Sequence, residues 1–187
     1  INLIDYITIS TTGNSVDFGD LVSASHGRET MGGGNSTRGI FAGGNIPKTN
    51  VISYITIAST GNAQDFGDLN TAGVNYTAGC SSSTRSIRGG GADNAAPTGN
   101  YSNAIHYVQI MSTGNAVDFG DETKTHKYCT GSGSRTRAIW SGSYNPATSD
   151  NISFNTFASQ GNSSDFGDMS YNGRFCTSAS NQTRSVN

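Results

Sequence analysis

The stretch that decides the fold is ISYITIASTGNAQDFGDL at residues 52–69, because the chain carries it in four related copies. The other copies occupy residues 4–21, 105–122 and 152–169, and each is followed by a small-residue segment that ends in Thr-Arg. A period near 50 residues, rich in strand formers and glycine turns, is typical of the blades of a β-propeller. The first Asp of the shared DFGD motif marks the four repeats at Asp17, Asp65, Asp118 and Asp165.

Within one repeat, the residue pattern predicts two strands joined by a tight turn. Residues 52–58 carry apolar groups on both faces, as expected for a strand that is covered on both sides. Gly61-Asn62 then supplies the positive φ angles of a hairpin. Phe66 is the large apolar residue of the next strand and is predicted to pack between neighbouring repeats. Its counterparts in the other copies are Phe18, Phe119 and Phe166.

Two further strands of small residues complete the repeat. Residues 76–81 and 86–91 flank a polar turn that contains Thr84-Arg85. The resulting order is a small-residue strand, a strand ending in Gly-Gly, a strand with Tyr and a strand with an aromatic residue, and it resembles the Kelch repeat. Gly89-Gly90 matches the double glycine, Ser141-Gly142 departs from it, and the Phe of DFGD takes the place of the Kelch Trp.

A second resemblance concerns the sequence motifs of the repeats. The motifs TGNAxDFGDL and STRxIxxGG are similar to repeats found in structural proteins of marine tailed phages. This resemblance implies a component of a virion or of an appendage and no particular activity.

The whole chain, residues 1–187, is expected to form a single all-β domain, a four-bladed propeller of the Kelch-like type. The chain begins inside a Tyr-containing strand and ends just after Thr183-Arg184, so the N- and C-terminal strands are expected to share the last blade and to close the ring. Such closure removes exposed strand edges. The alternative is a segment of a larger propeller, because no Gly-Gly follows Val186.

The composition excludes several kinds of partner. Charged residues make up 13% of the chain and the net charge is -2, so the basic surface that binds nucleic acid is missing. No apolar run approaches the length that crosses a membrane. The abundance of Asn, Ser and Thr suits β-structure that is extracellular or part of a virion.

The residues of types that could take part in catalysis or metal binding are expected to have structural roles. The odd cysteine count argues against a disulfide framework, and these residues are expected to be free and small fillers of the interior. The histidines occupy unlike or isolated positions, so no metal cluster and no cofactor is expected. The repeated Asp residues are expected to hydrogen-bond turn amides or to pair with the repeated Arg, and an Arg–carboxylate pair would fix the register. The residues concerned are Cys80, Cys129, Cys176, His26, His106 and His126.

No enzymatic activity is expected, and binding is assigned to loops on one face. The loops at residues 92–104 and 143–151 both join a Gly-containing strand to a Tyr-containing or Phe-containing strand, so they emerge together, and variable loops on a rigid scaffold commonly carry binding. The candidate residues for stacking on and hydrogen bonding to a sugar are Asn94, Tyr101, Tyr144 and Asn145.

Two functions are therefore expected from the sequence. The first is a non-enzymatic structural or adhesive module of a virion or extracellular fibre, which contacts copies of itself, other structural proteins or host-surface glycans. The alternative is a soluble, lectin-like propeller that binds carbohydrate.

Overall fold

The computed structural model describes residues 2–23, 31–44, 49–70, 74–93 and 100–187. These residues form strands and no helix, so the predicted all-β class is confirmed. No described segment forms a helix with the length and hydrophobicity needed to cross a bilayer.

Three antiparallel sheets account for most of the described chain. Each contains a small-residue strand, the strand after the Thr-Arg turn, the Tyr- or Phe-containing strand and the DFGD strand, in that order. The strand order predicted within one repeat is therefore confirmed. Sheet A consists of β3 (Met31–Gly34), β4 (Arg38–Ala42), β5 (Val51–Thr56) and β6 (Gln64–Asp68).

Sheets B and C repeat this arrangement with longer outer strands. The four main strands of sheet B are β8 (Ala78–Ser81), β9 (Arg85–Gly89), β11 (Asn100–Gln109) and β12 (Val117–His126). Two short strands extend this sheet: β10 (Ala92–Asp93) pairs with β11, and β7 (Val74–Asn75) pairs with β10. Sheet C consists of β13 (Thr130–Gly133), β14 (Arg137–Tyr144), β15 (Thr148–Thr156) and β16 (Ser164–Gly173).

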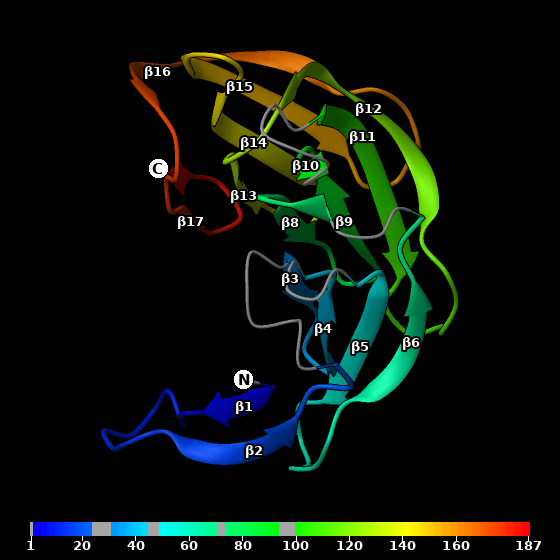
Figure 1. Cartoon of the computed structure of the whole chain (residues 1–187). Coiled ribbons are helices and arrows are strands. Elements are labelled where there is room, and N and C mark those ends of the chain that lie inside the picture. The colour runs from blue at the N-terminus through cyan, green and yellow to red at the C-terminus, as the bar shows by residue number, and fades with distance from the viewer. Residues whose placement is uncertain (1, 24–30, 45–48, 71–73, 94–99) are drawn as a thin grey trace.

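The three sheets follow one another along an open arc, with a hairpin at each end (Figure 1). The N-terminal hairpin consists of β1 (Leu3–Tyr6) and β2 (Val16–Asp20), and the C-terminal hairpin of β17 (Ala179–Ser180) and β18 (Ser185–Val186). Among the described strands, β1 pairs only with β2 and β18 only with β17. The shared last blade is therefore not formed here, and the closed four-bladed ring stays a prediction. The sequence identifies the type of each strand, but closure depends on the rotation from one sheet to the next.

The DFGD motif forms a β-bulge in every copy. In sheet A, Asp65 lies opposite Ser53 and Gly67 lies opposite Ile52, so Phe66 is the extra residue between them. The same register shift occurs in the N-terminal hairpin and in sheets B and C. A bulge turns the side chain of the extra residue in a new direction. Gly67 has a φ of 142°, a backbone conformation that favours glycine.

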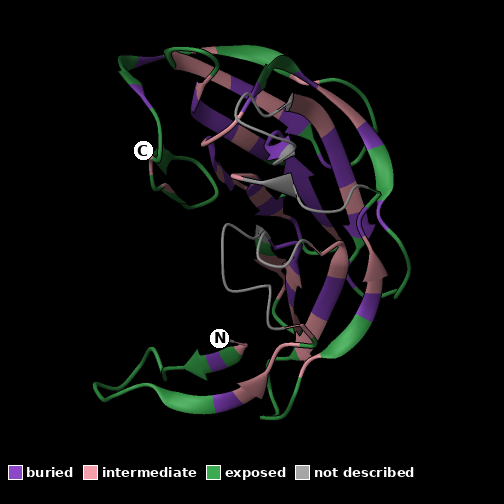
Figure 2. Ribbon diagram, viewed as in Figure 1, coloured by how far each residue is buried: buried purple, intermediate pink, exposed green. Residues whose placement is uncertain are grey.

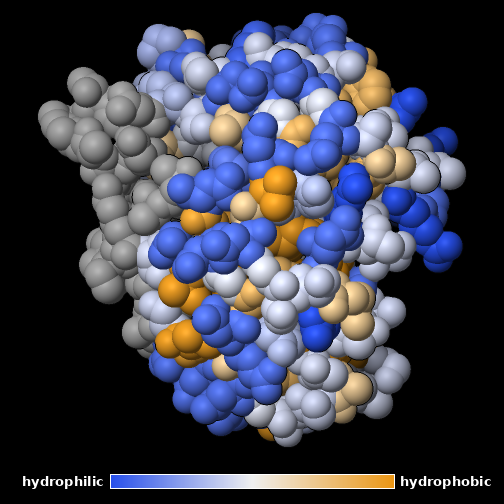
Figure 3. Space-filling view, turned by 90° about the vertical axis from the view of Figure 1, so that its right-hand side faces the viewer, coloured by the Kyte–Doolittle hydropathy of each residue, from blue (hydrophilic) through white to orange (hydrophobic). Residues whose placement is uncertain are grey.

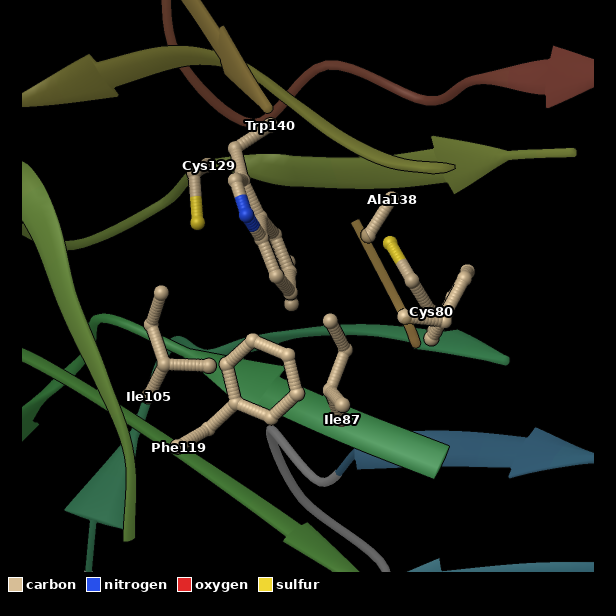
Figure 4. Close-up of a cluster of buried hydrophobic side chains, with 9 residues drawn as sticks. Cys80, Ile87, Ile105, Phe119, Cys129, Ala138 and Trp140 are labelled. Atoms are coloured by element: carbon tan, nitrogen blue, oxygen red, sulfur yellow. The ribbon is translucent and has the colours of Figure 1, made fainter. Parts of the chain in front are cut away.

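The core lies between successive sheets. Phe66 packs in one buried cluster with Val108, Ile110 and Ala116 of the next repeat. The second cluster joins sheets B and C, where Phe119 and Ile105 face Trp140 (Figure 4). The Trp140 indole nitrogen donates to Asn155 at 2.8 Å, so this buried polar group is satisfied.

Three of the four DFGD phenylalanines are buried as predicted, and the fourth is not. Phe18, Phe66 and Phe119 expose 7%, 3% and 2% of their surface, whereas Phe166 exposes 56%. The prediction is wrong for Phe166 because no following sheet covers sheet C in the described structure, and exposed residues gather at both ends of the arc (Figure 2).

The outer face of the arc is mainly hydrophilic. Apolar groups such as Ile57, Met111 and Val117 are about half exposed, and Figure 3 shows hydrophobic residues as separate patches among hydrophilic ones. Scattered apolar residues of this kind are normal on a protein surface. The ends of the arc are therefore more informative about partners than its outer face.

Candidate functional site

The first candidate site is the contact that joins one repeat to the next, called here the inter-sheet contact. The Gly-Asn turn before β12 docks on the bulge of β6. The amide of Gly114 donates to the Phe66 carbonyl at 2.7 Å, and the amide of Ala116 donates to the Asp68 carbonyl at 2.8 Å. The Asp68 amide in turn donates to Asn115 Oδ1 at 3.0 Å. Three hydrogen bonds thus fix the position of one sheet on its neighbour.

The inter-sheet contact occurs three times with nearly the same geometry. Residues 61–63 bind residues 18–20 through bonds of 2.7, 2.8 and 3.0 Å. Residues 161–163 bind residues 119–121 through bonds of 2.8, 2.8 and 3.0 Å. A Cβ atom on Gly67 would lie 2.6 Å from the Gly114 carbonyl carbon, so glycine is needed at the bulge for the backbones to approach. The contact explains why Gly-Asn and DFGD recur together.

The repeated arginine forms a second bond between neighbouring sheets. Arg38 Nη1 donates to the Ile110 carbonyl at 3.1 Å, and its guanidinium lies 4.4 Å from the centre of the Tyr54 ring. Arg85 binds the Phe157 carbonyl at 2.6 Å in the same way. The predicted Arg–Asp pair is therefore wrong, and the one ion pair found in the described chain is that of His126 with Glu122. The arginine reaches toward the next repeat, whereas the Asp carboxylates lie at the bulge.

Both halves of a fourth inter-sheet contact are left open at opposite ends of the arc. Within the described chain, residues 166–168 receive no Gly-Asn turn, and residues 13–15 dock on no bulge. A Cβ atom on Gly167 would meet no heavy atom within 4 Å, nor would one on Gly13. Ile9 is 96% exposed, whereas at the equivalent position Ile57 exposes 48%, Ile110 0% and Phe157 3%. A pocket of about 550 Å³ lies between sheet C and the C-terminal hairpin, where Arg137, Phe166 and Arg184 are among its lining residues.

The second candidate site is an aromatic cluster on the loop face. Tyr76, Tyr128 and Phe175 occupy equivalent positions and have φ angles of 59°, 64° and 55°. The centre of the Tyr128 ring lies 4.3 Å from that of Tyr76 and 3.9 Å from that of Phe175. The Tyr128 amide donates to the Tyr76 carbonyl at 3.0 Å, and the Phe175 amide donates to the Tyr128 carbonyl at 3.1 Å. These bonds hold the three strained backbones in place.

Two predicted binding residues join this cluster. Lys127 Nζ lies 5.0 Å from the ring centre of Tyr101 and 5.7 Å from that of Tyr144, and it is also within 5.5 Å of the rings of Tyr76 and Tyr128. These distances are typical of cation–π contacts. Beside them, a pocket of about 260 Å³ is lined by Tyr76, Thr77, Tyr128, Cys129, Phe175 and Cys176.

Of the other two predicted binding residues, one makes hydrogen bonds within the chain and one lies outside the described residues. Asn145 is exposed, but its Nδ2 donates to the Thr125 carbonyl at 2.8 Å and to Thr125 Oγ1 at 2.9 Å, so its amide group joins the β14–β15 turn to β12. Asn94 lies outside the described residues. Much of the expected loop at residues 143–151 is strand, because β14 extends to Tyr144 and β15 begins at Thr148.

A buried polar cluster, missed by the sequence analysis, lies under the aromatic cluster. Glu122, His126 and Cys129 are 4%, 6% and 8% exposed, and one potential ligand atom of each lies within 4.8 Å of the others. His126 Nε2 is 2.5 Å from Glu122 Oε2. The signal was present in the third copy, which reads DFGDE where the second and fourth read DFGDL and DFGDM.

The electrostatics of this cluster follow from its burial and its charges. Burial alone would lower the pKa of His126, but the nearby Cys129 and Glu122 raise that pKa to about 11. Burial raises the pKa of the Cys129 thiol. The pairing with Glu122 thus favours the imidazolium form of His126. All three cysteines are free, as predicted, with Cys80 and Cys129 buried and Cys176 half-buried.

Comparisons with known proteins add no functional assignment. No protein-family model matches the chain, and no curated protein is significantly similar to it.

Proposed function

We propose that this chain is a non-enzymatic structural module of a virion or extracellular fibre that joins further copies of itself head to tail. Residues 166–168 of one copy would receive the Gly-Asn turn at residues 13–15 of the next. The observation that supports this proposal is the inter-sheet contact, which forms three times within the chain and leaves both halves of a fourth open.

The open ends have the chemistry that such an assembly needs. Unpaired carbonyl and amide groups at a sheet edge can pair with another chain. The next copy would also cover Phe166, which is 56% exposed, and its Ile9 would reach the position beside Arg137 that Ile110 holds beside Arg38. A contact between two different surfaces of the same protein produces either a ring or an open fibre.

The closed four-bladed propeller is the other use of the same surfaces. In that arrangement the chain's own residues 13–15 would bind its residues 166–168, and β18 would pair with β1. A larger propeller would need further repeats between them. In Figure 1 the two hairpins lie apart on either side of the opening, and no described hydrogen bond joins them, so both open halves are available to a neighbouring copy.

The aromatic cluster favours a second candidate function, a lectin-like site. Tyrosine faces beside Lys127 and Arg174 combine stacking surfaces with hydrogen-bond donors, which suits a sugar or a host-surface glycan. An adhesive module could use this face for the host while its ends contact neighbouring copies.

Replacing Asn14 by alanine is expected to weaken association of copies about 2- to 10-fold without changing the melting temperature. The side chain makes no described contact within the chain, and one neutral hydrogen bond contributes about 0.5–1.5 kcal/mol. Light scattering over a range of protein concentrations measures the average mass. As the matched control, Asn115→Ala removes the bond to the Asp68 amide and should lower the melting temperature. A parent protein that stays monomeric at every concentration would contradict head-to-tail assembly and would favour the closed ring or the lectin-like module.

A further inference from the structure

We propose that Glu122, His126 and Cys129 form a binding site for a divalent transition-metal ion of the zinc class. This proposal is separate from the assembly of copies, because the residues lie inside sheet B and at the start of sheet C. The nitrogen, oxygen and sulfur atoms that these three side chains offer are the donors that Zn²⁺ takes from proteins. The potential ligand atoms lie within 4.8 Å of one another.

Sheet B departs from sheets A and C in two places at once. Glu122 stands where Leu69 and Met169 are buried, and it is buried as deeply as they are. Gly89 stands where the neighbouring repeats have Ala42 and Ser141, and a Cβ atom there would clash with Glu122 Oε1. The missing side chain on β9 thus makes room for the carboxylate on β12.

Two atoms of the buried side chains also lack a hydrogen-bond partner in the part of the chain that the structure describes. Glu122 Oε1 and His126 Nδ1 have no hydrogen-bond partner among the described residues, although both atoms are inaccessible to solvent. A buried polar atom without a partner costs about 1–3 kcal/mol. An ion pair of Glu122 with His126 uses one carboxylate oxygen and one ring nitrogen, so within the described chain it leaves the second oxygen and the second nitrogen without a partner.

A bound divalent cation would balance the charges of this site. A carboxylate, a thiolate and a neutral imidazole around one Zn²⁺ give a net charge of zero, which suits a buried position. Binding would release the His126 and Cys129 protons and would open the 2.5 Å separation of His126 Nε2 and Glu122 Oε2 to make room for the ion. Three protein ligands leave one coordination position for water. Cys129 also lines the 260 Å³ pocket, which provides a path for entry.

Cobalt is the probe that tests the site, because a thiolate bound to Co²⁺ gives an intense charge-transfer absorption. Chelator-treated protein titrated with Co²⁺ is expected to show this band together with the visible bands of a four-coordinate ion at one equivalent. Added Zn²⁺ should displace the Co²⁺ and raise the melting temperature. Absence of the charge-transfer band in the folded parent protein would overturn the proposal. Glu122 and His126 would then be only a buried ion pair.

Variants that restore the residues of other repeats provide the controls. Glu122→Leu copies the second repeat, and Cys129→Thr copies Thr77, so both should fold and lose Co²⁺ binding. His106→Ser copies Ser53 and Ser153 at a second buried histidine and should bind as the parent does. If the folded Glu122→Leu variant or the folded Cys129→Thr variant binds as tightly as the parent, the proposed ligand set is wrong.

Discussion

Replacing Phe66 by alanine is expected to lower the free energy of unfolding by about 3–5 kcal/mol, the usual cost of removing a fully buried phenylalanine. Phe66 is 3% exposed and fills the space between sheet A and the residues of sheet B that follow it. Its ring also packs edge-on against Tyr54, with the ring centres 5.8 Å apart. Urea unfolding followed by circular dichroism measures this loss.

Phe166 is the matched control, because it has the same place in the DFGD motif but is 56% exposed. Phe166→Ala is expected to cost less than about 1 kcal/mol in the isolated chain, as surface substitutions usually do. The same change should weaken association between copies. Equal losses for Phe66→Ala and Phe166→Ala in dilute solution would contradict the difference in burial.

Replacing Gly120 by alanine is the second change with a large expected effect. Its Cβ atom would lie 2.5 Å from the carbonyl carbon and oxygen of Gly161, and the φ of 143° is unfavourable for alanine. The backbone strain costs about 1–3 kcal/mol, and relieving the close contact costs a similar further amount. Thermal melting should therefore show a strongly destabilised protein or one that does not fold.

The control for Gly120→Ala is Gly167→Ala. Gly167 has a φ of 134°, so alanine meets a similar backbone strain, but no heavy atom lies within 4 Å of its Cβ position. The difference in stability between the two variants therefore measures the inter-sheet contact alone. Equal stabilities would show that the contact of Gly120 with Gly161 contributes little.

Much of the fold could be predicted from the sequence because the repeat reports on local and nearest-neighbour structure. The alternation around Ile55, the Gly61-Asn62 turn and the order of strands all depend on a few adjacent residues. The bulge that places Phe66 between sheets depends on a pairing register, which the letters DFGD do not display. The burial of Phe166 could not be predicted because it depends on what lies beyond sheet C.

The candidate sites were only partly predictable for a related reason. Tyr101 and Tyr144 were found because they lie on segments that differ between repeats. Tyr76, Tyr128 and Phe175 were missed because they occupy an equivalent position in three copies and look like scaffold residues. Glu122 was visible as the one acidic residue after DFGD, but its proximity to His126 depends on the irregular pairing of β12 with β11 between Asp121 and His126, which the sequence does not display.

If the open bulge of one copy binds the open turn of the next, oxidative cross-linking should trap that contact. In the formed contacts, the amide of Ser163 lies 2.8 Å from the Asp121 carbonyl, so the equivalent residues Ser15 and Asp168 should come within reach of a disulfide. The variant carries Ser15→Cys and Asp168→Cys, with Cys176→Ser to remove the half-buried native thiol. On a non-reducing gel, the account predicts a ladder of dimers and longer species that reduction abolishes. A single cross-linked monomer would show that the chain closes on itself, and no cross-link at all would show that the two ends do not meet.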